Sequence, residues 1–116
     1  MGGDLIMKQL PDKQFKYLFK HFIEAENKFL PDLGKLLYRI CNFAAGIDTS
    51  SARKIRNEIS DSEYRLVERA RYFCNFLEEV RMKCEKLEYY EACSNIANTI
   101  TIIQSGVHLY RECNYL

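Results

Sequence analysis

The sequence contains no tryptophan, only two prolines and only five glycines in 116 residues. It also lacks a repeat, a low-complexity tract and an apolar run long enough to cross a membrane, because polar residues interrupt its most apolar stretch, residues 96–109. With 47% hydrophobic and 28% charged residues, the composition is that of a globular protein and excludes collagen-like and disordered chains. We therefore expect a single domain over residues 1–116, with a flexible N-terminus at 1–11.

Charge of one sign is not in excess. The formal net charge of +1 gives no overall field that would attract nucleic acid or an anionic membrane, so such a partner would have to meet a local patch. The start of the chain shows no signal peptide, and Ile6 stands where a myristoylation motif requires serine or threonine. We expect a cytoplasmic protein without membrane association.

Metal ligands and catalytic anchors are also few. The five cysteines form no CxxC pair and have no histidine at metal-ligand spacing, so we expect free, mostly buried thiols in a reducing compartment and no metal site. The two histidines, His21 and His108, lack a carboxylate–histidine or cysteine–histidine pattern, and no phosphate-binding loop or nucleophile elbow occurs. The sequence thus predicts a protein without catalytic residues, cofactor or enzymatic activity.

Helical periodicity is what the sequence does contain, because apolar residues step by three and four along most of it. We expect an all-α fold, an antiparallel helical bundle of four main helices with a short extra helical segment before the third. The main helices are expected at 12–29, from Pro31 to a glycine cap at Gly46, from about Asp61 to 87, and at 89–110, with the short segment at 51–59. The spacing of Ser60 and Glu63 is that of a capping box, which predicts the start of the third main helix.

The last two main helices carry matching seams of apolar residues, in alternating steps of four and three, as in knobs-into-holes packing. The first seam consists of Leu66, Ala70, Phe73, Leu77, Val80, Cys84 and Leu87, and the second of Tyr89, Cys93, Ile96, Ile100, Ile103, Val107 and Tyr110. No proline or glycine separates the two seams, so a continuous helix that forms a coiled-coil dimer remains an alternative to a hairpin. The β-branched run at 99–103 also allows a strand, but no partner strand is present, and we expect a helix.

The junction at residues 53–64 has a recognisable pattern, in which Arg56 is followed by Asn57 and Tyr64 closes the segment. It resembles the motif of HEPN domains, small helical bundles of RNases, toxins and nucleotidyltransferase partners. In that family an arginine and a histidine from each of two protomers meet in a dimer cleft, where they bind and cleave RNA. Here Asp61 occupies the position of the histidine, and a carboxylate does not replace imidazole in proton transfer near neutral pH. The resemblance implies a relative with lost or impaired RNase activity.

Two groups of residues are candidate contacts. The first, for RNA or a partner, comprises Arg53, Arg56, Asn57, Asp61, Tyr64, Arg65 and Arg69, which also fit a helix cap and ordinary surface charges. The second is an aromatic stripe of Tyr72, Phe76 and Tyr90 that favours protein binding. We expect a non-catalytic helical-bundle interaction module that binds a protein partner or itself as a homodimer. The alternative is a HEPN-like RNA-associated protein of the toxin–antitoxin or nucleotidyltransferase-partner type.

Overall fold

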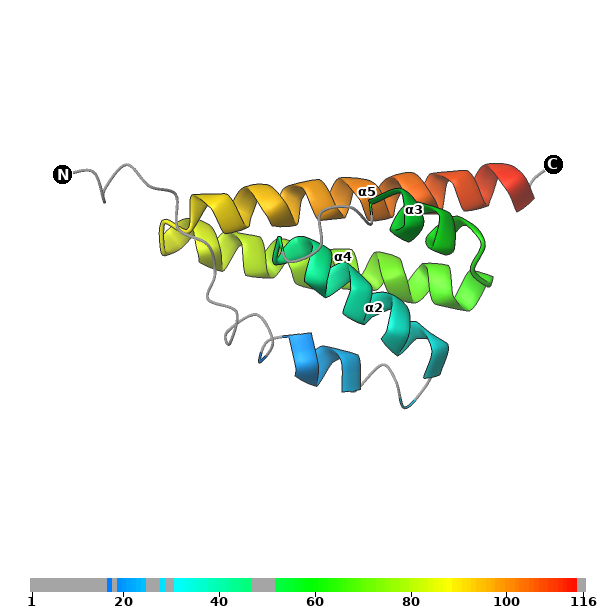
Figure 1. The fold of residues 1–116 in the computed structure, drawn as a ribbon, viewed down its shortest axis with the longest axis horizontal. Coiled ribbons are helices and arrows are strands. Elements are labelled where there is room, and N and C mark those ends of the chain that lie inside the picture. The colour runs from blue at the N-terminus through cyan, green and yellow to red at the C-terminus, as the bar shows by residue number, and fades with distance from the viewer. Residues whose placement is uncertain (1–16, 18, 25–27, 29–30, 47–51, 115–116) are drawn as a thin grey trace.

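The computed structural model describes residues 17, 19–24, 28, 31–46 and 52–114, and over these residues the chain is an all-α helical bundle (Figure 1). The predicted fold class is therefore confirmed. Its labelled helices are α2 (Pro31–Ala44), α3 (Ala52–Ser60), α4 (Tyr64–Lys86) and α5 (Tyr90–Asn114). Residues 19–24, within the first predicted helix, are also helical. The expected flexible N-terminus at 1–11 and the remainder of that first helix lie largely outside the described residues.

The two longest helices, α4 and α5, lie side by side and run in opposite directions (Figure 1). The turn between them contains Glu88, whose φ of 62° places it in the left-handed region without help from a glycine. The N–H of Leu87 donates to the carbonyl of Lys83 at 3.2 Å, and the N–H of Glu88 donates to that of Glu85 at 3.1 Å. These bonds satisfy carbonyls at the end of α4. The two predicted seams therefore serve a hairpin within one chain, and the continuous-helix alternative is wrong.

The buried face of this hairpin is broader than the two seams, because α2 and α3 also pack against it. Leu87 is the one seam residue that leaves the core: it lies in the turn and is 56% exposed. Val67, Cys74, Ala92 and Thr99 are buried although they lie outside the predicted seams. Thr99 donates its hydroxyl to the carbonyl of Asn95 at 2.7 Å, so its burial leaves no unpaired donor. The strand alternative at 99–103 is wrong, since α5 is continuous through this run.

The short helix α3 approaches α5 very closely at Gly106. A Cβ atom added to Gly106 would lie 2.8 Å from the Cβ of Ile59 and 2.9 Å from the carbonyl oxygen of Arg56. Ile55 and Ile59 of α3 are fully buried, and an ion pair between Arg39 and Glu58 connects α2 to α3. The absence of a side chain at Gly106 therefore sets how deeply α3 enters the bundle.

The third main helix begins a few residues later than predicted, and the predicted capping box does not form. Ser60 is the last residue of α3, and α4 begins at Tyr64 with Glu63 as its N-cap, without a side-chain capping bond. The N–H of Asp61 donates to the carbonyl of Asn57 at 2.9 Å, which continues the α3 bonding pattern. Burial of Ile59 keeps α3 helical through Ser60, so the Ser60 backbone cannot adopt the extended N-cap conformation. Gly46, in contrast, has the positive φ of 77° expected of a C-terminal glycine cap.

Candidate functional site

The first predicted group of contact residues is divided between α3 and α4. On α3, Arg53 and Asn57 are exposed, whereas Arg56 is half-buried. The Nε atom of Arg56 is enclosed and has no hydrogen-bond partner among the described residues. Asp61 follows α3 in the exposed turn. The structure therefore spreads these four residues along α3, from Arg53 in its first turn to Asp61 just after its last residue, with Arg56 turned partly inward.

On α4, the predicted residues Arg69 and Tyr72 are brought together. The guanidinium carbon of Arg69 lies 4.8 Å from the centre of the Tyr72 ring, within the range of a cation–π interaction. Tyr64 and Arg65 are exposed on the first turn of the same helix. Tyr72 remains 54% exposed although Arg69 covers one side of its ring.

The Phe22 ring packs against Tyr72 and connects it to a cluster of aromatic residues. The Phe22 ring stacks on Tyr72 at a centroid distance of 6.3 Å and on Phe76 at 4.8 Å, and it also contacts Phe73 at 4.9 Å. Phe76 is half-buried within this cluster and stacks on Phe22, so it contributes to the packed interior more than to an exposed surface. The apolar stripe of the first predicted helix includes Phe22, but periodicity gives no sign that Phe22 would meet Tyr72.

A solvent-open pocket of about 340 Å³ lies beside Tyr72, between α4 and α5. Its lining comprises Glu68, Arg71, Tyr72, Cys74, Asn75 and Gln104. An ion pair of 3.3 Å joins Glu68 to Arg71, so the charges of the lining balance. The lining still offers hydrogen-bond donors and acceptors to a ligand. Burial raises the pKa of Cys74 to about 12, which keeps the thiol protonated and removes it as a nucleophile. We name the outward-facing residues Glu68, Arg69, Arg71, Tyr72 and Asn75 the Tyr72 surface.

Tyr90, the third member of the predicted aromatic stripe, lies elsewhere. It is the first residue of α5, beside the turn that ends the hairpin, and it is exposed there together with Leu87 and Met82. The helical rise between Tyr72 and the end of α4 at Lys86 is about 21 Å. The structure therefore separates Tyr90 from the Tyr72 surface, because the aromatic residues that share a stripe in the sequence lie at opposite parts of the hairpin.

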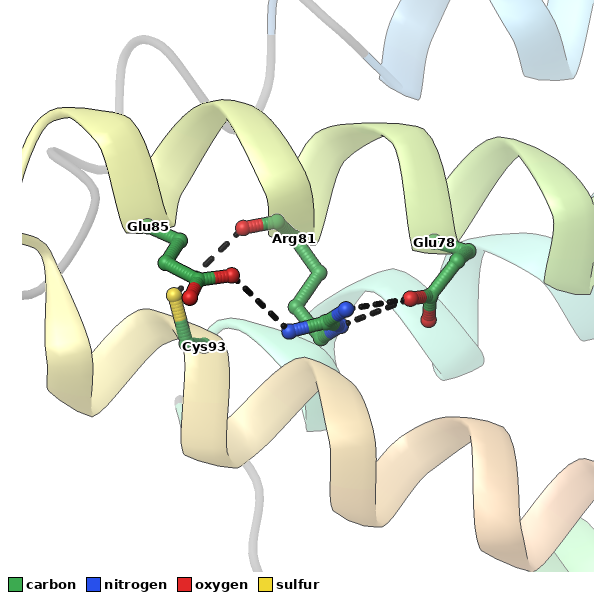
Figure 2. A network of polar contacts seen from close by, with 4 residues as sticks. All are labelled: Glu78, Arg81, Glu85 and Cys93. Carbon is green, nitrogen blue, oxygen red and sulfur yellow. Dashed lines mark hydrogen bonds and ion pairs between the residues drawn. The ribbon is translucent and has the colours of Figure 1, made fainter.

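The acidic end of the hairpin contains a polar network around Arg81 (Figure 2). Arg81 donates from Nε to Glu78 at 2.9 Å and from Nη1 to Glu85 at 3.4 Å, and its third nitrogen also contacts Glu78. The spacing of Glu78 and Glu85 around Arg81, three residues before and four after, is the signal from which this network is predictable on a helix. Acidic residues outnumber basic ones between residues 78 and 91, and Arg81 neutralises part of this excess.

Protonation of Glu78 is expected to remove a small stabilising interaction. The hydrogen bond from Arg81 is the main cause that lowers the pKa of Glu78 below its ordinary value of 4.5. Because the pKa is lower in the folded chain than in the unfolded chain, the interaction stabilises the fold above pH 4.5 and is lost as the pH falls below it. The side chain is 47% exposed, so the loss should stay below about 0.5 kcal/mol.

Urea unfolding of the wild type and of Glu78→Gln measures this contribution. The two proteins should differ near pH 7 and converge at about pH 3. Glu79→Gln is the matched control, because Glu79 is exposed beside Glu78 and makes no ion pair among the described residues. A wild type and Glu78→Gln variant that differ equally at both pH values would contradict the assignment.

The described residues contain no group of three or more histidine, cysteine, aspartate or glutamate side chains that could hold a metal ion. Within the same part of the chain, no helix is long and apolar enough to cross a membrane. No protein-family model matches the sequence, and no curated protein or solved structure was found to be similar to it.

Proposed function

We propose that the protein is a non-catalytic interaction module that binds a protein partner through the Tyr72 surface. The observation that carries the proposal is the state of Tyr72, which is exposed over half of its area and yet contacts both the Arg69 guanidinium and the Phe22 ring. An exposed aromatic side chain usually loses rotamer freedom when it binds. Here the neighbouring groups have already restricted it, which lowers the entropic cost of association.

The composition of the Tyr72 surface supports the same proposal. Tyrosine and arginine are among the residues enriched in the dominant contacts of protein interfaces. The adjacent pocket offers the Asn75 and Gln104 amides and the Glu68 and Arg71 pair, so it suits a polar side chain or a turn of backbone from a partner. Its balanced charge is poorly suited to a run of phosphates, which favours a protein over a nucleic acid.

Loss of the Tyr72 ring is expected to weaken partner binding by about 30-fold or more, as for an anchor residue at the centre of an interface. Partners are selected on the immobilised wild-type chain, identified by mass spectrometry, purified and measured by calorimetry against wild type and Tyr72→Ala. Tyr38→Ala is the matched control, because Tyr38 on α2 is 61% exposed and has no ring contact among the described residues. Circular dichroism verifies that both variants remain folded.

The outcomes distinguish the alternatives. Binding that is lost in Tyr72→Ala and kept in Tyr38→Ala supports the proposal. If the immobilised chain captures a second copy of itself, and sedimentation shows a dimer, the partner is identified as a second copy. Equal binding by the wild type and Tyr72→Ala would overturn it. The HEPN-like alternative predicts instead that labelled RNA is bound in low salt by the wild type and by Tyr72→Ala but not by Arg56→Ala.

A further inference from the structure

Two cysteines flank the turn of the α4–α5 hairpin: Cys84 lies near the end of α4 and Cys93 near the start of α5. The backbone connects them through a single residue of the turn: the N–H of Tyr89 donates to the carbonyl of Cys84 at 2.9 Å, and the N–H of Cys93 donates to the carbonyl of Tyr89 at 3.0 Å. Both cysteines also contribute to the packed interior, with Cys84 buried and Cys93 packed against the core. Both cysteines are therefore bonded to the same turn residue, at the turn end of α4 and of α5.

The side chain of Cys93 points at α4 near Cys84. Its Sγ lies 3.4 Å from the carbonyl oxygen of Arg81, which is one helical turn before Cys84 (Figure 2). Burial is the main cause that raises the pKa of Cys84, and the charge of Cys93 raises it further, as expected for neighbouring thiols. We propose that Cys84 and Cys93 form an intramolecular disulfide that closes the end of the hairpin under oxidising conditions.

The remaining cysteines of the long helices do not compete for this bond. Cys74 precedes Cys84 by about 15 Å of helix, and Cys113 follows Cys93 by about 30 Å. A disulfide requires Cα atoms within about 7 Å, so neither residue can replace its neighbour in the pair without unfolding a helix. Cys113 is exposed near the end of α5 and therefore serves as an internal control for reagent access.

The chemistry needs only a low-molecular-weight disulfide such as oxidised glutathione. Cys93 is the point of entry because it is partly exposed, whereas Cys84 is enclosed. The Cys93 thiolate attacks one sulfur of the reagent, forms a mixed disulfide and displaces one glutathione thiolate. The Cys84 thiolate then attacks the Cys93 sulfur and displaces the second. Two protein thiols are oxidised, one glutathione disulfide is reduced to two thiols, and the two released protons pass to the two leaving thiolates.

The surroundings of Cys93 set the pH dependence of this reaction. Burial and the Glu85 carboxylate raise the pKa of Cys93, and Arg81 partly opposes them. Other charged groups of the adjacent turn, Lys83, Lys86, Glu88 and Glu91, lie on the two helices or the loop that flank the pair. Because the thiolate is the attacking species, the bond should form slowly near neutral pH and faster as the pH rises.

The test uses the full folded chain treated with oxidised glutathione, followed by alkylation of the remaining thiols and tryptic digestion. Cleavage after Lys83, Lys86 and Arg111 places Cys84 in residues 84–86 and Cys93 in residues 87–111. We expect these two peptides to be joined, with a mass lower by two hydrogens than the sum of the separate peptides. The joined species should be present in Cys113→Ser and absent from Cys93→Ser. The Cys93 variant is preferred to one at Cys84 because Cys93 is only partly buried.

A stability measurement provides a second readout. A disulfide that closes the loop from Cys84 to Cys93 lowers the conformational entropy of the unfolded chain. The equilibrium constant for unfolding of the oxidised wild type should therefore be on the order of tenfold to a hundredfold smaller than that of the reduced protein. Cys93→Ser should show no such change on oxidation. The proposal is overturned if Cys93 is recovered as a mixed disulfide with glutathione while Cys84 stays free, or if Cys93 is joined to Cys41 or to another chain.

Discussion

Phe73→Ala is expected to lower the free energy of unfolding by about 4 kcal/mol. Phe73 is fully buried, and its ring lies at the centre of the aromatic cluster, 5.7 Å from Phe19, 4.9 Å from Phe22 and 5.9 Å from Phe76 between ring centroids. Truncation leaves a cavity that these stacked rings cannot fill without losing contact with one another. Since small domains are stable by only about 5–15 kcal/mol, the effect should be a large fraction of the total.

Urea unfolding followed by far-ultraviolet circular dichroism measures this loss, and hydrogen exchange adds a local prediction. Residues 19–24 hold two of the rings that contact Phe73, so their amide protection should fall further than that of α5. Met82→Ala on the same helix is the control, because Met82 is exposed and its truncation should cost less than about 1 kcal/mol. Similar losses in the two variants would show that the cluster is not a packed core.

Gly106→Ala is expected to destabilise the protein by about 2 kcal/mol, although intrinsic helix propensity alone favours alanine over glycine by about 1 kcal/mol. The new methyl group would lie 2.8 Å from the Cβ of Ile59 and 2.9 Å from a backbone carbonyl, closer than such atoms can approach. Since neither group is the free end of a flexible side chain, α3 must move away from α5. The opposite signs of propensity and packing make the result decisive.

Equilibrium unfolding of Gly106→Ala is compared with Ala97→Gly, a matched exchange of the same two residues at an exposed position of α5. The control should be destabilised by about 1 kcal/mol through propensity alone. A second variant, Ile59→Ala in the Gly106→Ala background, removes the Ile59 Cγ2 atom, which would lie 3.1 Å from the new methyl group, so its added cost should be smaller than that of Ile59→Ala alone. A Gly106→Ala protein that is more stable than the wild type would contradict the close contact.

The helices themselves were predictable because their signals are local. Apolar spacing along α4 and α5 gives the residues that face inward from Ala70 to Cys84 and at Ile96, Ile103 and Val107. Gly46 marks the end of α2 because few other residues adopt its backbone conformation. The capping box failed for a related reason: a motif of four residues competes with the burial of Ile59, and tertiary packing extends α3 through the predicted cap.

The candidate site was predictable only in part. Arg69 and Tyr72 are three residues apart on one helix, so their contact follows from helical geometry. The support from Phe22 and the contribution of Gln104 to the pocket come from elements distant in the sequence, and no local pattern states which segments meet. Tyr90 illustrates the converse, since a stripe of aromatic residues that is continuous in the sequence is interrupted when the chain reverses at Glu88.

The amino-acid sequence alone determines that this chain forms helices, which faces of α4 and α5 are apolar, and that it lacks the residue patterns of a metal site or a known catalytic motif, because each of these depends on residue types at short spacing. Only the tertiary structure decides that the two seams close on each other within one chain, that α3 lies against Gly106, and that Phe22 packs against Tyr72. The reason is physical: an apolar stripe is buried equally well by many partners, and the choice among them depends on the shapes that fit when all the helices pack together.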